Sequence, residues 1–504
     1  MDVRTLYSFE ELGRSTFGKR FSSDYIVDEM RKSMATTAGV SGSSDASAIR
    51  LENLDMVMSS VLFDESHLML FNWLHKYPST QNFYQWNRRN QYGSGRSRIG
   101  FLEGGGPGGS LASWNRFGTY VKWLGVKRGL THQMMLTGSA GGSQLDPVAE
   151  ENRDGTLDLL EKVERGLLWF DSNIDGQVFD GILRQVFNGS NSNIPGPPTI
   201  DPGSMFGFNI VDMHGASLTR DDITDVATKF FNRKVQNFKN LNMFTSGDVI
   251  ADLDKTLSNS DRIFLPRGEG EGFVSGHYLA GHRTRFGTIP FTPTVFSDPF
   301  ETKAPLATAT AAISAPAAPT CTAISPSSQT TPGHTVPAPT ATGNTVTWTP
   351  ISNFKTADAK TYYYSVSAVD AAGETIATVS TGTAVSSTQV VTVVTTRVTN
   401  ALYYVVYRGL VADGSDAKYI GMVSQANSSG DAKFVDTNFI MAGTDSVWFL
   451  ERTPSNMVVA QMAPLTKMLL PQEQTTFPFF LLLYVSLVVK VAERQIIFMN
   501  VGSA

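Results

Sequence analysis

The spacing of apolar residues predicts two helices in the first third of the chain. A turn-rich segment at 36–47 precedes a run with apolar residues at helical spacing, which favours a helix with one buried face. Its apolar positions are Leu51, Leu54, Met58, Val61 and Leu62. A clearer stripe opens at Asp146 and Pro147 and continues to about Asp171. Its apolar positions are Leu157, Leu160, Val163, Leu167 and Phe170.

Residues 82–131 alternate aromatic and polar side chains and are rich in glycine. Aromatic residues of this kind are typical of strands, whereas glycine at such density is unsuited to a compact core element, because it loses the most entropy on ordering. We therefore expect a long two-stranded excursion with a glycine-rich tip that carries Arg96, Arg98 and Arg116. The alternative interpretation is a disordered surface loop.

A helix–strand–helix order is predicted within 204–300, which indicates mixed α and β packing. Thr219 has the character of an N-cap, and Asp222 three residues later forms a variant of the capping box. The apolar face of this first helix comprises Ile223, Val226, Ala227 and Phe230. The sequence NLNMFTS follows as a strand, and Ile250, Leu253 and Leu257 mark the second helix.

The composition changes at Ala304, since no charged residue occurs from there to Phe354. The stretch 304–344 is rich in Ala, Thr, Pro and Ser, which predicts a linker. Short β-rich segments separated by turn residues follow over 345–445 and are typical of a β-sandwich. The last residues, 446–504, include two strongly apolar strands that need other strands to pair with. We therefore interpret the sandwich as an insertion into a larger domain whose chain resumes after it.

Composition and charge narrow the class of protein. The 504 residues suggest about three domains. The 41 basic and 46 acidic residues give a net charge of −5, which disfavours a protein that wraps nucleic acid. A single cysteine, Cys321, excludes an intramolecular disulfide framework. The N-terminus lacks the apolar core of a signal peptide, and the apolar run 477–489 is too short to span a membrane.

No motif in the sequence predicts an active site, a metal site or a cofactor site. GEGEGF at 268–273 lacks the Lys-Ser/Thr of a phosphate-binding loop. His277 and His282 are five residues apart, whereas a helical metal pair needs a spacing of four; Glu269 and Glu271 could supply carboxylates only in a weaker arrangement. No G-x-S-x-G elbow is present, and Cys321 has no basic neighbour to activate it.

The order of these segments resembles the major capsid proteins of tailed bacteriophages with the Hong Kong 97 phage fold, most closely in texture those of Twort-like myophages. The resemblance covers about 1–300 and 446–504. It depends on FYQWNRRNQYGSGRSRIGFLEGGG, on KRGLTHQM, on EENRDGTLDLLEKVERGLLWFDSNI followed by VFDGILRQV, and on the closing YVSLVVKVAERQIIFMNV. The inserted segment, with TWTP, YYYSVSAVDAAGE and YYVVYRG, resembles an immunoglobulin-like or fibronectin type III sandwich.

The resemblance implies an α+β fold with named parts. These are an N-terminal arm and helix (1–80), an E-loop (81–131), a P-domain with a spine helix (132–203) and an A-domain (204–303). A linker (304–344), an inserted Ig-like domain (345–445) and a return to the A- and P-domains (446–504) complete the chain. The stripe from Leu157 to Phe170 would be the core-facing side of the spine helix.

The resemblance also implies a function. Copies would form pentamers and hexamers that close into an icosahedral shell around double-stranded DNA, with the inserted domain projecting outward. The E-loop would contact a neighbouring subunit through Arg96, Arg98, Phe101, Trp114, Arg116 and Phe117. Its arginines would pair with carboxylates on the neighbour's spine helix.

Implied partners are portal and scaffolding proteins, a possible decoration protein, and packaged DNA through non-specific contacts. Neither a membrane nor a cofactor is implied. The protein would assemble in the bacterial cytoplasm and reside in the virion. Some relatives cross-link the E-loop between Lys and Asn; in this chain Lys122 and Lys127 lie near the loop base and none at its tip, so we expect no such bond. We also expect no removal of an N-terminal segment.

Two other classes remain open at this point. A tail tube or sheath protein also assembles from many copies of itself. A glycan-active enzyme with a fibronectin-like module is the second alternative, and the absence of a signal peptide argues against it.

Overall fold

The computed structural model describes most of the chain from residue 67 onward. The described residues are 67–92, 103, 105, 111–137, 147–187, 209–233, 235, 238–255, 281–300, 303–325, 329–332, 345–348, 352–425, 431–472 and 475–502. The chain divides into two compact units, 1–62 and 63–504, and all described residues belong to the second. The predicted N-terminal arm and its helix therefore lie outside the described residues, as does most of the tip of the predicted E-loop.

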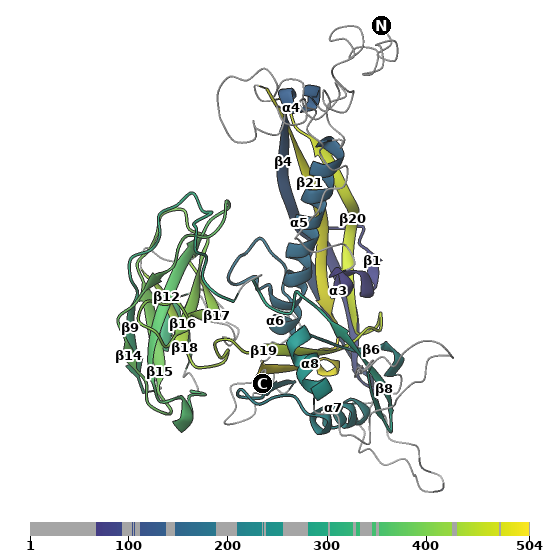
Figure 1. Cartoon of the computed structure of the whole chain (residues 1–504). Coiled ribbons are helices and arrows are strands. Elements are labelled where there is room, and N and C mark those ends of the chain that lie inside the picture. The colour runs from purple at the N-terminus through teal and green to yellow at the C-terminus, as the bar shows by residue number, and fades with distance from the viewer. Residues whose placement is uncertain are drawn as a thin grey trace, which may run out of the picture. The chain divides into compact units, whose positions relative to one another are not determined.

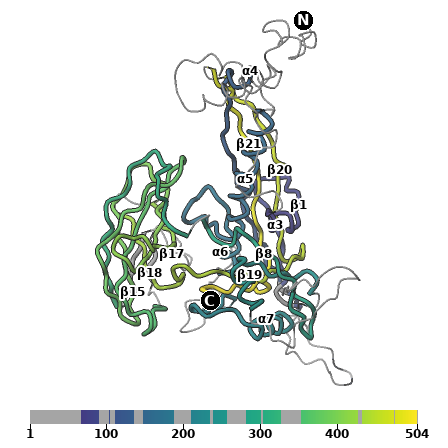
Figure 2. The backbone as a smooth tube through the Cα atoms, viewed as in Figure 1, coloured from purple at the N-terminus to yellow at the C-terminus, as the bar shows by residue number. Residues whose placement is uncertain are grey.

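A four-stranded sheet and a long helix form the first part of the body (Figure 1). The strand order is β1 (Lys76–Pro78), β20 (Met457–Leu469), β21 (Thr476–Val489) and β4 (Lys122–Thr131). Helix α5 (Pro147–Trp169) packs on β4 and β21, and the backbone trace shows it running alongside these strands (Figure 2). Two short helices, α3 (Met69–Trp73) and α6 (Ile182–Phe187), pack beside α5, and α4 (His132–Thr137) follows β4.

The prediction of a long helix from Asp146 to about Asp171 is confirmed by α5. Val163 and Leu167 are buried as expected, whereas Leu157, Leu160 and Phe170 are half-buried. Leu159, Leu168 and Trp169 are buried in addition. The predicted apolar stripe is therefore too narrow, because the C-terminal half of α5 is covered on several sides.

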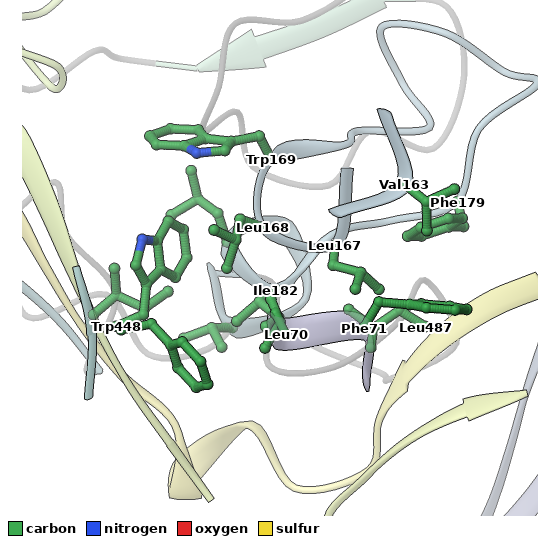
Figure 3. Packing of buried hydrophobic residues seen from close by; sticks show 14 of the residues in the cluster. Leu70, Phe71, Val163, Leu167, Leu168, Trp169, Phe179, Ile182, Trp448 and Leu487 are labelled. Carbon is green, nitrogen blue, oxygen red and sulfur yellow. The ribbon is translucent and has the colours of Figure 1, made fainter. Parts of the chain in front are cut away.

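The core of this part lies where α5 meets α3, α6 and strand β19 (Asp445–Glu451). Figure 3 shows Leu167 and Leu168 beside Ile182 and Leu70. The indole rings of Trp169 and Trp448 meet edge to face with centroids 5.5 Å apart. Segments distant in sequence thus share one apolar interior.

A six-stranded sheet forms the second part of the body, in the order β5 (Ile210–Asp212), β22 (Ile496–Val501), β19, β6 (Leu241–Thr245), β8 (Gly287–Pro293) and β7 (Gly281–Thr284). Helices α7 (Arg220–Asn232) and α8 (Gly247–Lys255) share its core, with the 3-10 turn η5 (Phe238–Asn240). The predicted capping box is confirmed: Thr219 Oγ1 accepts the N–H of Asp222, and Asp222 Oδ2 accepts the N–H of Thr219 at 2.9 Å. The buried face of α7 contains the four residues predicted for it, Ile223, Val226, Ala227 and Phe230.

Two antiparallel sheets with a common core make up the β-rich segment. One contains β13 (Thr378–Val379), β12 (Thr361–Val369), β16 (Tyr403–Gly409) and β17 (Lys418–Ser424), with β14 (Thr383–Ala384) also paired to β12. The other contains β18 (Ala432–Asp436), β15 (Val390–Thr395) and β9 (Thr320–Ile324). Tyr364 and Tyr404 of the first sheet and Val391 and Phe434 of the second lie in this core.

The predicted linker at 304–344 requires a correction. Strand β9 lies within it and pairs with β15, and β10 (Gln329–Pro332) pairs with β11 (Thr345–Trp348). The prediction is wrong at these positions because composition alone does not distinguish a linker from a strand that is low in charge and rich in Thr and Ala. The sandwich therefore begins before residue 345.

The body sheet shows where the sandwich enters the chain. Strand β6 lies between β8 and β19, and Thr245 pairs with Pro293 on one side and with Val447 on the other. The chain leaves the sheet after β8 and returns to it at β19. The sandwich strands all lie between these two points of the sequence.

Candidate interaction surfaces

Strands β2 (Phe83–Gln91) and β3 (Ser113–Tyr120) form the two-stranded excursion predicted from the sequence. At its base, Trp86 and Phe117 lie opposite each other and pack on the body sheet. Gly118 is required beside them, because an added Cβ would come within 2.3 Å of the Phe83 ring. The base of this hairpin is thus anchored on its own chain.

The outer half of the hairpin exposes aromatic and apolar side chains next to arginines. Tyr92 is 85%, Trp114 56% and Leu111 93% exposed. The Arg89 guanidinium lies 4.0 Å from the centroid of the Trp114 ring and 4.9 Å from that of Tyr92, which holds the rings in place by cation–π contact. Residues 83–92 and 111–120 contain three arginines and no acidic residue. Arginine and large aromatic residues are the types enriched at protein interfaces.

The six residues predicted to contact a neighbouring subunit have different outcomes. Trp114 and Arg116 are exposed on β3, and the Arg116 Nε donates to Asn87 Oδ1 at 3.2 Å. Phe117 is only 3% exposed and packs within its own chain, so its assignment to an inter-subunit contact is wrong. Arg96, Arg98 and Phe101 lie outside the described residues.

The sequence interpretation omitted Arg89 and Tyr92, which belong to the exposed group on the hairpin. A signal was available, because Arg89 pairs directly with Trp114 in the register of the two strands. Side chains of paired residues lie on the same face.

A second surface is the face of the four-stranded sheet that points away from α5. Because side chains alternate along a strand, the strand register places Trp123 with Tyr484, and Lys127 with Phe480 and Met468, on this face. Further along the same face, Val458, Ala460 and Val488 are covered by the base of the hairpin. Trp123 and Met468 are exposed. We call the part around Trp123, Phe480 and Met468 the open sheet face.

Acidic residues gather in the first half of α5. Arg128 of β4 lies between two of them, 2.9 Å from Asp158 and 3.5 Å from Glu151. Lys162 is a second partner of Asp158, at 2.8 Å. Asp154 is exposed. Part of the acidic surface is therefore neutralised within the chain.

One acidic residue of α5 is deeply buried. Glu164 is 1% exposed, and its two carboxylate oxygens accept the backbone N–H groups of Leu70 and Phe71 at 2.5 and 2.7 Å. Helix α3 has no side-chain cap of its own, so Glu164 caps it from another helix. Burial raises the pKa of Glu164 to about 7, although these hydrogen bonds and the charge of Lys76 act in the opposite direction.

The loop after α5 contains a calcium-type pattern that the sequence interpretation missed. Asp171, Asn173, Asp175 and Gly176 follow the D-x-N-x-D-G spacing of calcium loops. In this chain a guanidinium is the neighbouring cation: Arg184 Nε lies 3.5 Å from Asp171 Oδ1. Burial and Asp171 raise the pKa of Asp180, which also faces this guanidinium.

The described residues contain no group of three or more His, Cys, Asp or Glu side chains that could hold a metal ion. The His282 ring contacts Thr224 Oγ1 at 3.1 Å, and burial followed by the charge of Arg220 lowers its pKa. His277, Glu269 and Glu271 lie outside the described part of the chain. Burial raises the pKa of the Cys321 thiol to about 11. Within the same described ranges, no helix is both long enough and apolar enough to cross a membrane.

No family model matches the sequence, and no curated protein sequence matches it. Among solved structures, the chain is similar to the holo-SrpI encapsulin complex of Synechococcus elongatus PCC 7942 (9% identity, TM-score 0.42, covering 92% of this chain and 97% of that one). It is also similar to the capsid of an empty GTA particle (7%, 0.45, 91% and 98%) and to the capsid of Myoviridae phage XM1 (9%, 0.40, 91% and 98%). Identities and scores of this size leave the chain unassigned to a family.

Proposed function

We propose that the chain is the major capsid protein of a tailed bacteriophage, of the Twort-like type, and that its copies assemble into a closed shell. The observation that carries the proposal is the hairpin of β2 and β3. It is anchored on its own sheet at the base, while its outer half presents arginine and exposed aromatic rings. A two-stranded hairpin is marginally stable by itself, so a partner surface for the outer half is expected.

The chain offers a suitable partner surface on another copy. The sheet face that receives Trp86 and Phe117 at the hairpin base continues into the open sheet face. The same residue types of the hairpin therefore have a place to pack one subunit further along. The basic hairpin also complements the acidic first half of α5 on that neighbour. Such a contact joins two different surfaces and repeats from copy to copy, as in a ring.

The finer assignments belong to this proposal. The hairpin is the E-loop, α5 is the spine helix of the P-domain, and the six-stranded sheet is the A-domain. The two packed antiparallel sheets constitute an Ig-like domain that projects outward from the shell. Pentamers and hexamers enclose double-stranded DNA, and portal and scaffolding proteins take part in assembly in the host cytoplasm.

Negative-stain microscopy of the purified full-length chain tests the proposal. We expect closed isometric particles. Tubes would instead indicate a tail tube or sheath protein, and a chain that stays monomeric at all concentrations in light scattering would refute self-assembly.

A double variant, Arg89→Ala with Trp114→Ala, tests the hairpin itself. Loss of central interface residues commonly costs about 2 kcal/mol or more, so particle yield should fall at least about tenfold. Leu402→Ala is the matched control, because Leu402 is an exposed apolar residue of the sandwich, and its particle yield should be unchanged. Full particle yield from the double variant would contradict the role assigned to the hairpin.

A further inference from the structure

His214 occupies an unusual position between two carboxylates. It follows strand β5 with a φ of 48°, in the left-handed region that side chains other than glycine rarely adopt. Its Nε2 lies 3.0 Å from Asp358 Oδ2, and its Nδ1 lies 3.6 Å from Asp212 Oδ2. Asp212 belongs to the body, whereas Asp358 lies in the 3-10 turn η6 (Thr356–Asp358) that precedes β12 of the sandwich. Strained residues of this kind persist where the surrounding structure holds them.

Both carboxylates are held in place by other donors. Asp212 accepts Asn500 Nδ2 at 2.7 Å on one oxygen and Asn353 Nδ2 at 2.6 Å on the other. Asp358 Oδ2 also accepts the backbone N–H of Lys355 at 2.9 Å. The two acceptors therefore cannot turn away from the imidazole without breaking further hydrogen bonds.

The charged groups around the imidazole are few. Asp212 faces it from β5 and Asp358 from η6. Behind Asn438, whose amide approaches Asp358 at 3.5 Å, lies the buried ion pair of Arg408 and Asp436. These groups, with the neutral amides of Asn353 and Asn500, are the polar surroundings of His214.

We propose that protonated His214 is a pH-dependent link between the β-sandwich and the body of the chain. A neutral imidazole has one N–H and one lone pair, so with a carboxylate beside each nitrogen it directs the lone pair at one of the two anions. The imidazolium donates at both nitrogens and is attracted to both carboxylates. Raising the pH through the range in which histidines titrate, roughly pH 5–8, therefore weakens one of the two contacts.

A second polar link between the two parts provides an internal reference. Lys303 contacts Asp445 and lies 3.5 Å from Asp298, close to the points where the chain leaves and re-enters the body sheet. The neighbouring carboxylates raise the pKa of Lys303 above its ordinary 10.5, so this lysine keeps its charge throughout the pH range of interest. Asp298 has a pKa raised by burial to about 6, so its titration is nearly complete above pH 7.

Hydrogen exchange of the full-length chain, followed by mass spectrometry at pH 7 and pH 8.5 and corrected for intrinsic exchange, tests the proposal. The peptides of interest cover 209–216 and 352–360. We expect their protection to fall about tenfold more than that of α7 as the pH rises, the ratio that corresponds to one charge-assisted hydrogen bond. His214→Gln should remove this additional fall, and Asp358→Asn should do so independently if the first variant folds poorly.

His282→Gln is the matched control, because His282 is a second described histidine and its ring contacts Thr224, which belongs to the body. This variant should keep the wild-type pH response. Equal protection of the two peptides at both pH values, or an unchanged response in His214→Gln, would overturn the proposal.

Discussion

Glu164 allows the opposing effects of burial and hydrogen bonding to be separated. Its pKa is raised from 4.5 to about 7, so the folded chain binds this proton more tightly than the unfolded chain does. The sign follows directly: stability contributed by this group is complete below pH 4.5 and is lost as the pH rises through 7. The shift of about 2.5 pH units corresponds to about 3 kcal/mol.

Replacement of Glu164 by Gln keeps the shape and resembles the protonated acid. At pH 5 the variant and the wild type should therefore hold α3 about equally well. At pH 8 the wild type buries a charge and the variant does not, so the variant should protect α3 better, by up to about a hundredfold in hydrogen exchange. The measurement is exchange of the amides of 69–74 at both pH values, which reports local opening without assuming two-state unfolding of a chain this large.

Glu161→Gln is the control on the same helix, because Glu161 is half-buried and pairs with Arg165 at 2.8 Å. It should leave the exchange of α3 unchanged. If Glu164→Gln instead exposes α3 at pH 8 more than at pH 5, the two hydrogen bonds to the carboxylate outweigh its burial, and the expected sign of the effect is wrong.

Three further predictions concern single side chains. Thr219→Ala removes the cap of α7 and should cost about 1 kcal/mol, seen as roughly fivefold faster exchange of its first-turn amides, whereas Thr219→Ser should change little. Cys321 should react with a thiol reagent at pH 8 roughly a hundredfold more slowly in the folded chain than after denaturation, because its pKa is raised from 9.0 to about 11; equal rates would contradict its burial. Arg408→Met leaves the buried Asp436 without its ion-pair partner and should lower the stability of the sandwich by about 3–5 kcal/mol, and adding Asp436→Leu should recover most of the loss in thermal unfolding.

The elements that could be predicted from sequence are those whose signal is local. Helix α5 follows from its apolar spacing, and the capping box of α7 from Thr219 and Asp222, because both depend on residues three or four apart. The hairpin of β2 and β3 follows from aromatic alternation around a glycine-rich stretch. For each of these, the interactions that form the element lie close together in the chain.

The positions that could not be predicted depend on distant partners. The alternation of β3 places Trp114 and Phe117 on particular faces, but which face meets the body depends on β20 and β21, which lie more than 300 residues later in the sequence. Strand β9 was missed because its pairing with β15 is a property of residues about 70 positions apart. Glu164 carried no signal at all, since a glutamate within a helix is ordinarily solvated.

The pairing of Thr245 with both Pro293 and Val447 has a practical consequence for engineering. The two ends of the chain that enclose the sandwich are level with each other across a single strand, which puts them about 10 Å apart. A foreign module whose own termini have a similar separation could be grafted there without stretching the acceptor sheet. If the chain assembles as proposed, each grafted module would be displayed once per subunit.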